Sequence, residues 1–230
     1  MRNLVEVAKL RTIPLFNGLS EEAFSELTSI LQCKDFSSET AIITSNQPGE
    51  VVYIILEGSV RVVTEGRDRD VILAVLGPGE VIGEMSVLDG SGRSATVITQ
   101  EKSTLLWLGR SVFWEKLWKI DPVPLNMARI LSQRLRLCAA QIQALASFDV
   151  NGRIARQLLA FANEHGEPTK SGGIIIPMRI TQAELADMVG ASRVSVNQTL
   201  VSWKECKYIT VDVNSHITIL NKAALTQYAR

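Results

Sequence analysis

A glycine-rich segment in the first half of the chain carries side chains that could hold an anion. It runs from Gly77 to Ala95, with a carboxylate at Glu84 and the pair Arg93-Ser94 near its end. Backbone amides, a guanidinium and a hydroxyl together bind phosphate oxygens, and an ionised carboxylate accepts from a ribose hydroxyl. The segment predicts a phosphate cradle; tight turns around a solvated arginine are the open alternative. Its expected ligand contacts are Gly83, Glu84, Met85, Arg93, Ser94 and Ala95.

A second group of polar residues lies near the C-terminus and has the pattern of a helix-turn-helix. Thr181 and Glu184 form a capping box, in which each side chain bonds the other residue's backbone amide, and they open a short helix. Gly190 ends that helix, and Ser192 can cap a second helix over residues 193–206. Two helices joined by a short glycine-containing turn are typical of DNA-binding motifs.

The second of these helices begins with short or forked polar groups, which suit base edges in a major groove. Val196 is expected in the core, whereas Arg193 is expected to bond a guanine. Two alternating runs around Asn214-Ser215 predict a β-hairpin wing, which argues against the alternative of a helical hairpin for protein contacts. The expected DNA contacts are Thr181, Ser192, Arg193, Val194, Ser195, Asn197 and Gln198.

The elements that would position these groups are readable from hydrophobic periodicity. Residues 34–108 alternate short β-branched runs with turn clusters, which predicts an all-β barrel or double sheet. A helix over residues 19–32, capped by Ser20, precedes it. The expected strands are 41–44, 51–56, 60–64, 71–76, 95–99 and 103–108, and the expected later helices are 111–119, 122–147 and 152–163.

The helix over residues 122–147 carries an apolar seam with a spacing of three and four residues. A seam this narrow favours a partner helix from a second copy of the chain, although packing within its own domain is the alternative. Its members are Leu131, Leu135, Cys138, Ile142 and Leu145.

Composition limits the class of protein. No apolar run approaches the roughly 20 residues of a membrane span, and an acidic residue at Glu6 argues against a secretion signal, so we expect a cytoplasmic protein without a membrane partner. Three scattered cysteines form neither a disulfide framework nor a CxxC pair. The net charge is zero, but from Val150 onward nine Lys/Arg outnumber six Asp/Glu, and such a surplus is typical of a region that contacts a polyanion.

Taken in order, the motifs resemble the cyclic-AMP receptor protein / fumarate-nitrate regulator (CRP/FNR) superfamily of bacterial transcription factors. The resemblance covers nearly the whole chain. It implies an α+β protein with an N-terminal jelly-roll, a cyclic-nucleotide-binding-like β-barrel, then a long dimerisation helix and a C-terminal winged helix-turn-helix. The expected boundaries are 1–120, 121–148 and 149–230. The motifs are residues 56–61, 77–80, 83–85, 92–95, 148–155 and 185–193.

The resemblance also implies residue roles. In the cyclic-AMP binders the counterpart of Arg93 pairs with the cyclic phosphate, that of Ser94 supports it and that of Glu84 takes the ribose hydroxyl. Cys138 and Ala139 stand where those proteins present Thr and Ser to the adenine, and neither is a good donor. Cyclic AMP in another contact pattern, a related cyclic nucleotide, a cyclic dinucleotide and a vestigial pocket with effector-independent DNA binding therefore remain open.

Other branches of the superfamily carry metals, and this sequence departs from them. Iron–sulfur sensors need an N-terminal cysteine cluster, and haem sensors need a histidine in the sensor domain, whereas His165 and His216 lie in the other half. We expect no metal and no covalent cofactor. Without a histidine beside the cradle there is no nucleophile–base pair, so we expect a protein that is not an enzyme.

The reading helix departs from cyclic-AMP-type regulators, which follow the arginine with Glu and place a second Arg four residues later. Val194 and Gln198 occupy those places, and the string resembles the nitrogen-control branch, which favours a GTA…TAC palindrome. The implied partners are a palindromic operator in DNA, a second copy of the chain and RNA polymerase. The rival role is a cyclic-nucleotide-binding module that acts on protein partners.

Overall fold

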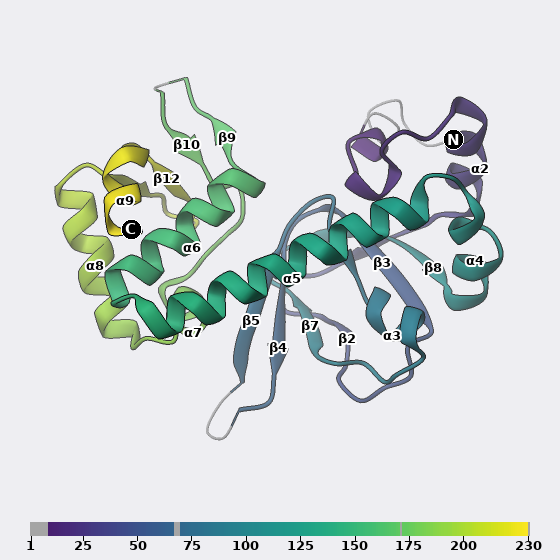
Figure 1. Cartoon of the computed structure of the whole chain (residues 1–230), viewed down its shortest axis with the longest axis horizontal. Helices are drawn as coiled ribbons and strands as arrows, with labels where there is room; N and C mark the ends of the chain where they lie inside the picture. Colours follow the sequence, from purple (N-terminus) through teal and green to yellow (C-terminus); the bar gives the residue numbers. More distant parts are fainter. Residues whose placement is uncertain (1–8, 67–69, 171, 230) are drawn as a thin grey trace. The chain divides into compact units, whose positions relative to one another are not determined.

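The computed structural model describes residues 9–66, 70–170 and 172–229, which fall into two compact units (Figure 1). The described residues up to Asp70 and Ala74–Leu135 make up unit 1. Unit 2 consists of Val71–Leu73 and the described residues from Arg136 onward. The long helix α5 (Val123–Ser147) contributes its first part to unit 1 and its second part to unit 2.

Two four-stranded antiparallel sheets form the jelly-roll that the short β-branched runs predicted. One sheet has the order β1-β8-β3-β6 and the other the order β2-β7-β4-β5. The strands are β1 (Gln32–Phe36), β2 (Ala41–Ile43), β3 (Val51–Glu57), β4 (Val60–Thr64), β5 (Val71–Leu76), β6 (Val81–Ile82), β7 (Thr96–Thr99) and β8 (Ser103–Gly109).

Strand β3 is buried on both faces, which explains its unbroken apolar run. Val52 and Ile54 point into a cluster with the helices of unit 1. Ile55 belongs to a second cluster, together with Val97 of β7 and Leu105 of β8, which come from different sheets. A strand covered by helices on one side and by a facing sheet on the other cannot alternate with polar residues.

The helices of unit 1 lie before and after the sheets. The predicted helix over residues 19–32 is confirmed with Ser20 as its cap, but its end was wrong. It stops at Ile30, because from Gln32 the backbone pairs with β8 instead. The sequence prediction missed α3, a short helix flanked by left-handed glycines at Gly83 and Gly90. The helical elements are η1 (Pro14–Phe16), α2 (Glu21–Ile30), α3 (Glu84–Asp89), α4 (Arg110–Glu115) and η2 (Leu117–Lys119).

Unit 2 contains the predicted helix-turn-helix and wing. Helix α6 begins at Val150, two residues earlier than predicted, because the side chain of Asp149 caps it. The wing strands pair around a left-handed Ser215 and extend a sheet of order β11-β12-β10-β9. The elements are α6 (Val150–Glu164), β9 (Glu167–Pro168), β10 (Ile174–Ile175), α7 (Gln182–Met188), α8 (Arg193–Glu205), β11 (Ile209–Val211), β12 (Ile217–Ile219) and α9 (Lys222–Tyr228).

The described helices include none with both the length and the apolar character that crossing a bilayer requires. The 25 residues of α5 are long enough, but charged and amide side chains interrupt its apolar positions.

Candidate ligand cradle and nucleic-acid interface

Arg93 is the centre of the predicted cradle, and the residue as a whole is only 7% exposed. Its Nη1 donates to the carbonyl of Gly83 at 2.7 Å and to Oγ of Ser86 at 2.8 Å. Its Nη2 donates to the carbonyl of Val51 at 2.6 Å. A guanidinium has five N–H donors, so three of them hold the side chain in place and two are left for an anion.

Two glycines are required by the close approach of backbone and side chains at this point. Gly83 has φ +77°, and a Cβ there would lie 2.6 Å from Nη1 of Arg93. A Cβ on Gly49 would lie 2.5 Å from the side chain of Ser86. Any larger residue at either position would displace the guanidinium or the helix that supports it.

Glu84, the first residue of α3, is 3% exposed and is paired with a residue that the sequence analysis did not assign to the site. Nη1 of Arg134, on α5, donates to Oε1 of Glu84 at 2.8 Å, and Nη2 donates to the carbonyl of Val81 at 2.6 Å. Arg134 directly precedes Leu135 of the apolar seam, and its position in the sequence carried no signal of this contact. An ionised carboxylate accepts several bonds, so Glu84 keeps capacity for a ligand hydroxyl.

The electrostatics of the cradle reflect its burial. Desolvation lowers the pKa of Arg93, and attraction to Tyr53, Glu84 and Glu50 opposes that shift. Arginine nevertheless stays protonated in proteins. Burial likewise raises the pKa of Tyr53, against the opposing effect of Arg93. The cradle therefore presents a fixed positive charge with little competing water, which strengthens a pairing with an anion.

The remaining predicted ligand contacts differ in their exposure to solvent. Met85 and Ser94 are exposed, whereas Ala95 is buried. Cys138 is exposed on the part of α5 that belongs to unit 2, and its assignment to a ligand base stays a prediction. The structure thus brings Gly83, Glu84 and Arg93 together and adds Ser86, which the sequence analysis missed.

In unit 2 the capping predictions for the helix-turn-helix are confirmed in detail. The amide of Glu184 donates to Oγ1 of Thr181 at 3.3 Å, and the amide of Thr181 donates to Oε2 of Glu184 at 2.7 Å. The amide of Ser195 donates to Oγ of Ser192 at 3.0 Å, which caps α8. These caps satisfy backbone amides at both helix starts and fix where each helix begins.

Helix α8 has one buried and one exposed face. Val196 is fully buried, as predicted, whereas Val194 is 67% exposed. Arg193, Asn197 and Gln198 are exposed as well, and Ser195 is partly so. The predicted contacts of this helix therefore share a solvent-facing surface at its first turns, which is the part of a recognition helix that reaches base edges.

Two side-chain bonds that the sequence analysis did not foresee attach α8 to its neighbours. Oγ1 of Thr199 donates to Oδ1 of Asn151 on α6 at 2.7 Å. Nε2 of Gln182 on α7 donates to Oδ1 of Asn197 at 2.8 Å. The second bond restrains the side-chain amide of Asn197, which is exposed.

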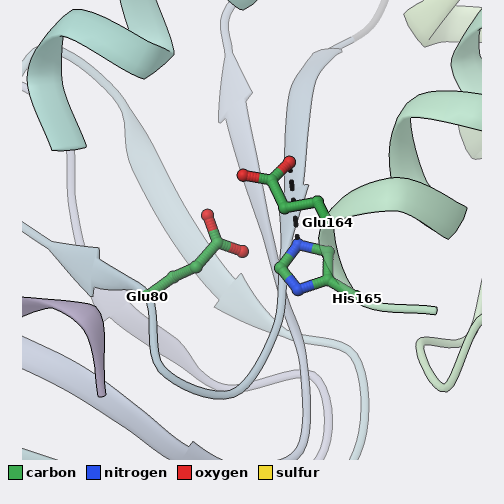
Figure 2. A group of neighbouring side chains, drawn as sticks. All are labelled: Glu80, Glu164 and His165. Atoms are coloured by element: carbon green, nitrogen blue, oxygen red, sulfur yellow. Dashed lines mark ion pairs between the residues drawn. The ribbon is translucent and has the colours of Figure 1, made fainter. Parts of the chain in front are cut away.

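The end of α6 carries a further pair of titratable groups. Nε2 of His165 lies 3.9 Å from Oε2 of Glu164 (Figure 2), and the two form an ion pair only when the imidazole is protonated. Glu80, drawn in the same figure, belongs to unit 1 and is not part of this pair. A partly exposed ion pair at this distance contributes at most about 1 kcal/mol to stability. We do not propose a functional site at this pair.

Comparisons with known proteins agree with this division of the chain. Residues 33–118 match the family described as "Cyclic nucleotide-binding domain" and residues 152–228 match the "Crp-like helix-turn-helix domain". A "CRP-like cAMP-activated global transcriptional regulator" of Mycobacterium tuberculosis is 30% identical over 218 residues, which cover 94% of this chain and 96% of that protein. The "Cyclic AMP receptor protein" of Thermus thermophilus is 31% identical over 190 residues, covering 81% and 83%.

Solved structures show the same architecture. The catabolite activator protein of Thermus thermophilus matches with a TM-score of 0.53 at 28% identity, covering 94% of this chain and 98% of that chain. FixK2 of Bradyrhizobium japonicum matches with a TM-score of 0.75 at 18% identity, covering 87% and 98%, and so supports the fold alone. With its cyclic-nucleotide-binding-like jelly-roll and its helix-turn-helix, the chain belongs to the CRP/FNR family of transcription regulators.

Proposed function

We propose that the chain acts as a homodimer that binds a palindromic operator through α8 and responds to a cyclic nucleotide or a related phosphate-bearing effector in the barrel. The DNA-binding role rests on one observation: α8 has one exposed, mostly polar face and one buried, mostly apolar face. Arg193, Val194 and Asn197 share the exposed surface of a helix whose opposite face is packed around Val196. Arg193 would form the forked contact with a guanine, a pairing that separates bases by roughly 1–3 kcal/mol.

The effector role rests on the cradle around Arg93. Its buried guanidinium has donors in reserve, and Glu84 has acceptor capacity beyond its bond to Arg134. An anionic phosphate and a neighbouring hydroxyl are the groups that such a pair accepts. Cyclic AMP is the first candidate, since the similar regulator of Mycobacterium tuberculosis is described as cAMP-activated.

One observation, at the place where the base of the effector would lie, supports a second candidate. Cys138 and Ala139 offer no strong hydrogen-bond donor, in a position where the resemblance implies contacts with adenine. A cyclic dinucleotide or another cyclic nucleotide would not depend on those donors. Binding of DNA without any effector is the corresponding second function.

The dimer is proposed through α5. Leu135 and Ile142 are 72% and 69% exposed, and Cys138 lies between them on the same stripe. Leu131, the first member of the predicted seam, is partly buried and packs against the core of unit 1 instead. The stripe that is left for a second copy of the chain therefore begins at Leu135. A stripe of large apolar residues left in water is typical of an association surface.

The proposed partner protein, cellular location and lack of catalysis follow from the role of a DNA-binding regulator. A regulator that reads an operator would contact RNA polymerase and work in the cytoplasm, and it would carry no catalytic group. We propose no metal or covalent cofactor for it.

Calorimetry and operator binding test the proposal together. An operator selected from random DNA would be titrated by fluorescence anisotropy, with and without cyclic AMP, cyclic GMP and a cyclic dinucleotide. We expect binding of one nucleotide to give a heat signal in calorimetry. The same nucleotide should change operator affinity about 5–150-fold, the usual range for allosteric coupling between two sites. Sequence-specific binding without heat from any nucleotide would favour the effector-independent function, and no specific binding would refute both.

A further inference from the structure

The second part of α5 is attached to the turn of the helix-turn-helix within unit 2. Nε2 of Gln141 donates to the backbone carbonyl of Met188 at 2.8 Å. Met188 is the last residue of α7, so its carbonyl has no partner inside that helix. One helical turn further along α5, Leu145 reaches the turn itself, since a Cβ on Gly190 would lie 3.0 Å from its Cδ2. Ala144 between them is buried.

The attachment uses a face of α5 that overlaps the apolar stripe only at its end, where Leu145 belongs to both. Consecutive residues of an α-helix are rotated by slightly more than a quarter-turn. Gln141 and Ala144 therefore lie on one face, and Ile142 of the exposed stripe lies about a quarter-turn away. A second copy of the chain could cover the stripe as far as Ile142 without disturbing the bond between Gln141 and Met188.

We infer that Gln141 is a positioning residue that fixes the DNA-reading helix relative to the dimerisation helix, and so sets the half-site spacing that the dimer accepts. The inference rests on the proposed function, because it needs a dimer on a palindrome. Gly190 joins the end of α7 to the start of α8, where Arg193 lies. Anchoring Met188 to α5 therefore restrains the direction in which each copy presents Arg193.

The chemistry of the bond allows a sharp test. Glutamate has nearly the shape of glutamine but is acceptor-only when ionised. Gln141→Glu would thus face the carbonyl of Met188 without a donor and would release the anchor. Gln141→Ala removes the side chain without adding a charge. Gln143→Glu is the matched control, because Gln143 is an exposed glutamine of the same helix segment.

The experiment measures binding by wild type and the three variants to the selected palindrome and to versions with one base pair added or removed between half-sites. A single half-site measures the reading unit alone, and sedimentation measures the dimer. Wild type and Gln143→Glu should reject the altered spacers. In both Gln141 variants that rejection should weaken about five-fold, the equivalent of one hydrogen bond, with half-site binding and dimerisation unchanged.

The outcomes separate the inference from the function on which it rests. Gln141 variants that keep the wild-type spacing profile overturn the inference and leave the function standing. Variants that lose single half-site binding to the same degree also overturn it, since Gln141 would then serve only the folding of unit 2. A wild type that binds without a spacing preference would refute the proposed dimer on a palindrome.

Discussion

Arg134 on α5 binds Oε1 of Glu84 at 2.8 Å, so the carboxylate at the start of α3 is held by the same helix that carries the exposed apolar stripe. Glu84 is almost fully buried, and burying a charged group is costly unless it is paired and hydrogen-bonded. The acid of the proposed cradle and the helix α5 are therefore connected by one charge-assisted bond. Any effector that engages Glu84 has to share it with Arg134.

Substituting Arg134 with alanine is expected to destabilise the protein by about 2 kcal/mol, because a hydrogen bond to a charged group is lost and Glu84 stays buried. Glu84→Gln in the same background should recover most of that loss, since the uncompensated charge is gone. Thermal unfolding of the two single variants and the double variant measures the coupling. Additive effects would show that the two side chains do not interact in solution.

Arg93→Ala should lose far more effector affinity than Ser94→Ala, because the buried guanidinium supplies the charge-assisted bonds and Ser94 is exposed. Arg93→Lys should also bind weakly, since an ammonium cannot bond Gly83, Val51 and an anion in the same planar arrangement. Calorimetry with the nucleotide that binds wild type measures all three. Equal losses at Arg93 and Ser94 would contradict the arrangement proposed for the cradle.

Leu135→Glu is expected to convert the dimer to a monomer and to abolish operator binding with it. Each large apolar side chain that is covered in the dimer contributes roughly 1.5–3 kcal/mol of transfer free energy, and a carboxylate there would lose it. Leu125→Glu is the control, because Leu125 is an exposed leucine of the same helix outside the stripe. A Leu135→Glu protein that sediments as a dimer would show that the stripe is not the interface.

Val194→Glu is expected to change the preferred base next to the guanine read by Arg193. Glutamate accepts from a cytosine amine, whereas valine offers only apolar contact. Selection from random DNA with both proteins tests this, and Val201→Glu, further along α8, serves as the control. An identical motif from wild type and Val194→Glu would mean that this exposed valine does not face a base.

The wing should respond to acid through Asp212. Backbone and side-chain hydrogen bonds from His216 lower the pKa of Asp212, helped by the amide of Asn214. A carboxyl group with a lowered pKa in the folded state stabilises it fully above its unfolded pKa and loses that contribution as the pH falls through the folded pKa. Unfolding of wild type and Asp212→Asn should therefore differ at neutral pH and converge in acid. A constant difference at every pH would exclude this role of the carboxylate.

The sequence predicted best those features that depend on local chemistry. The capping box of α7 and the N-cap of α8 involve residues only three apart, and the buried position of Val196 follows from helical periodicity. Most strands of the jelly-roll could be predicted for the same reason, since β-branched runs between turns have few alternatives. The sequence analysis missed the short helix α3 because glycines flank it on both sides, a pattern that is typical of loops.

Contacts between residues far apart in the chain could not be predicted. Arg134 and Glu84 are separated by 50 positions. Arg93 is 42 positions from Val51, and Gln141 is 47 positions from Met188. Nothing in the local pattern around Arg134 distinguishes it from the solvated arginines on the same helix. The domain boundaries and the residue roles taken from the resemblance stay predictions.

Because β3 is buried on both faces, we expect the layers on its two sides to unfold together. Because Ile54 and Ile55 belong to different hydrophobic clusters, neither the helical layer nor the facing sheet can detach without exposing one side of the same strand. Loss of either layer should therefore be linked to loss of the other, which makes the barrel a single cooperative block. Amide protons of β3 should be the last in that block to exchange with deuterated solvent, and partial openings should be confined to edge strands such as β1.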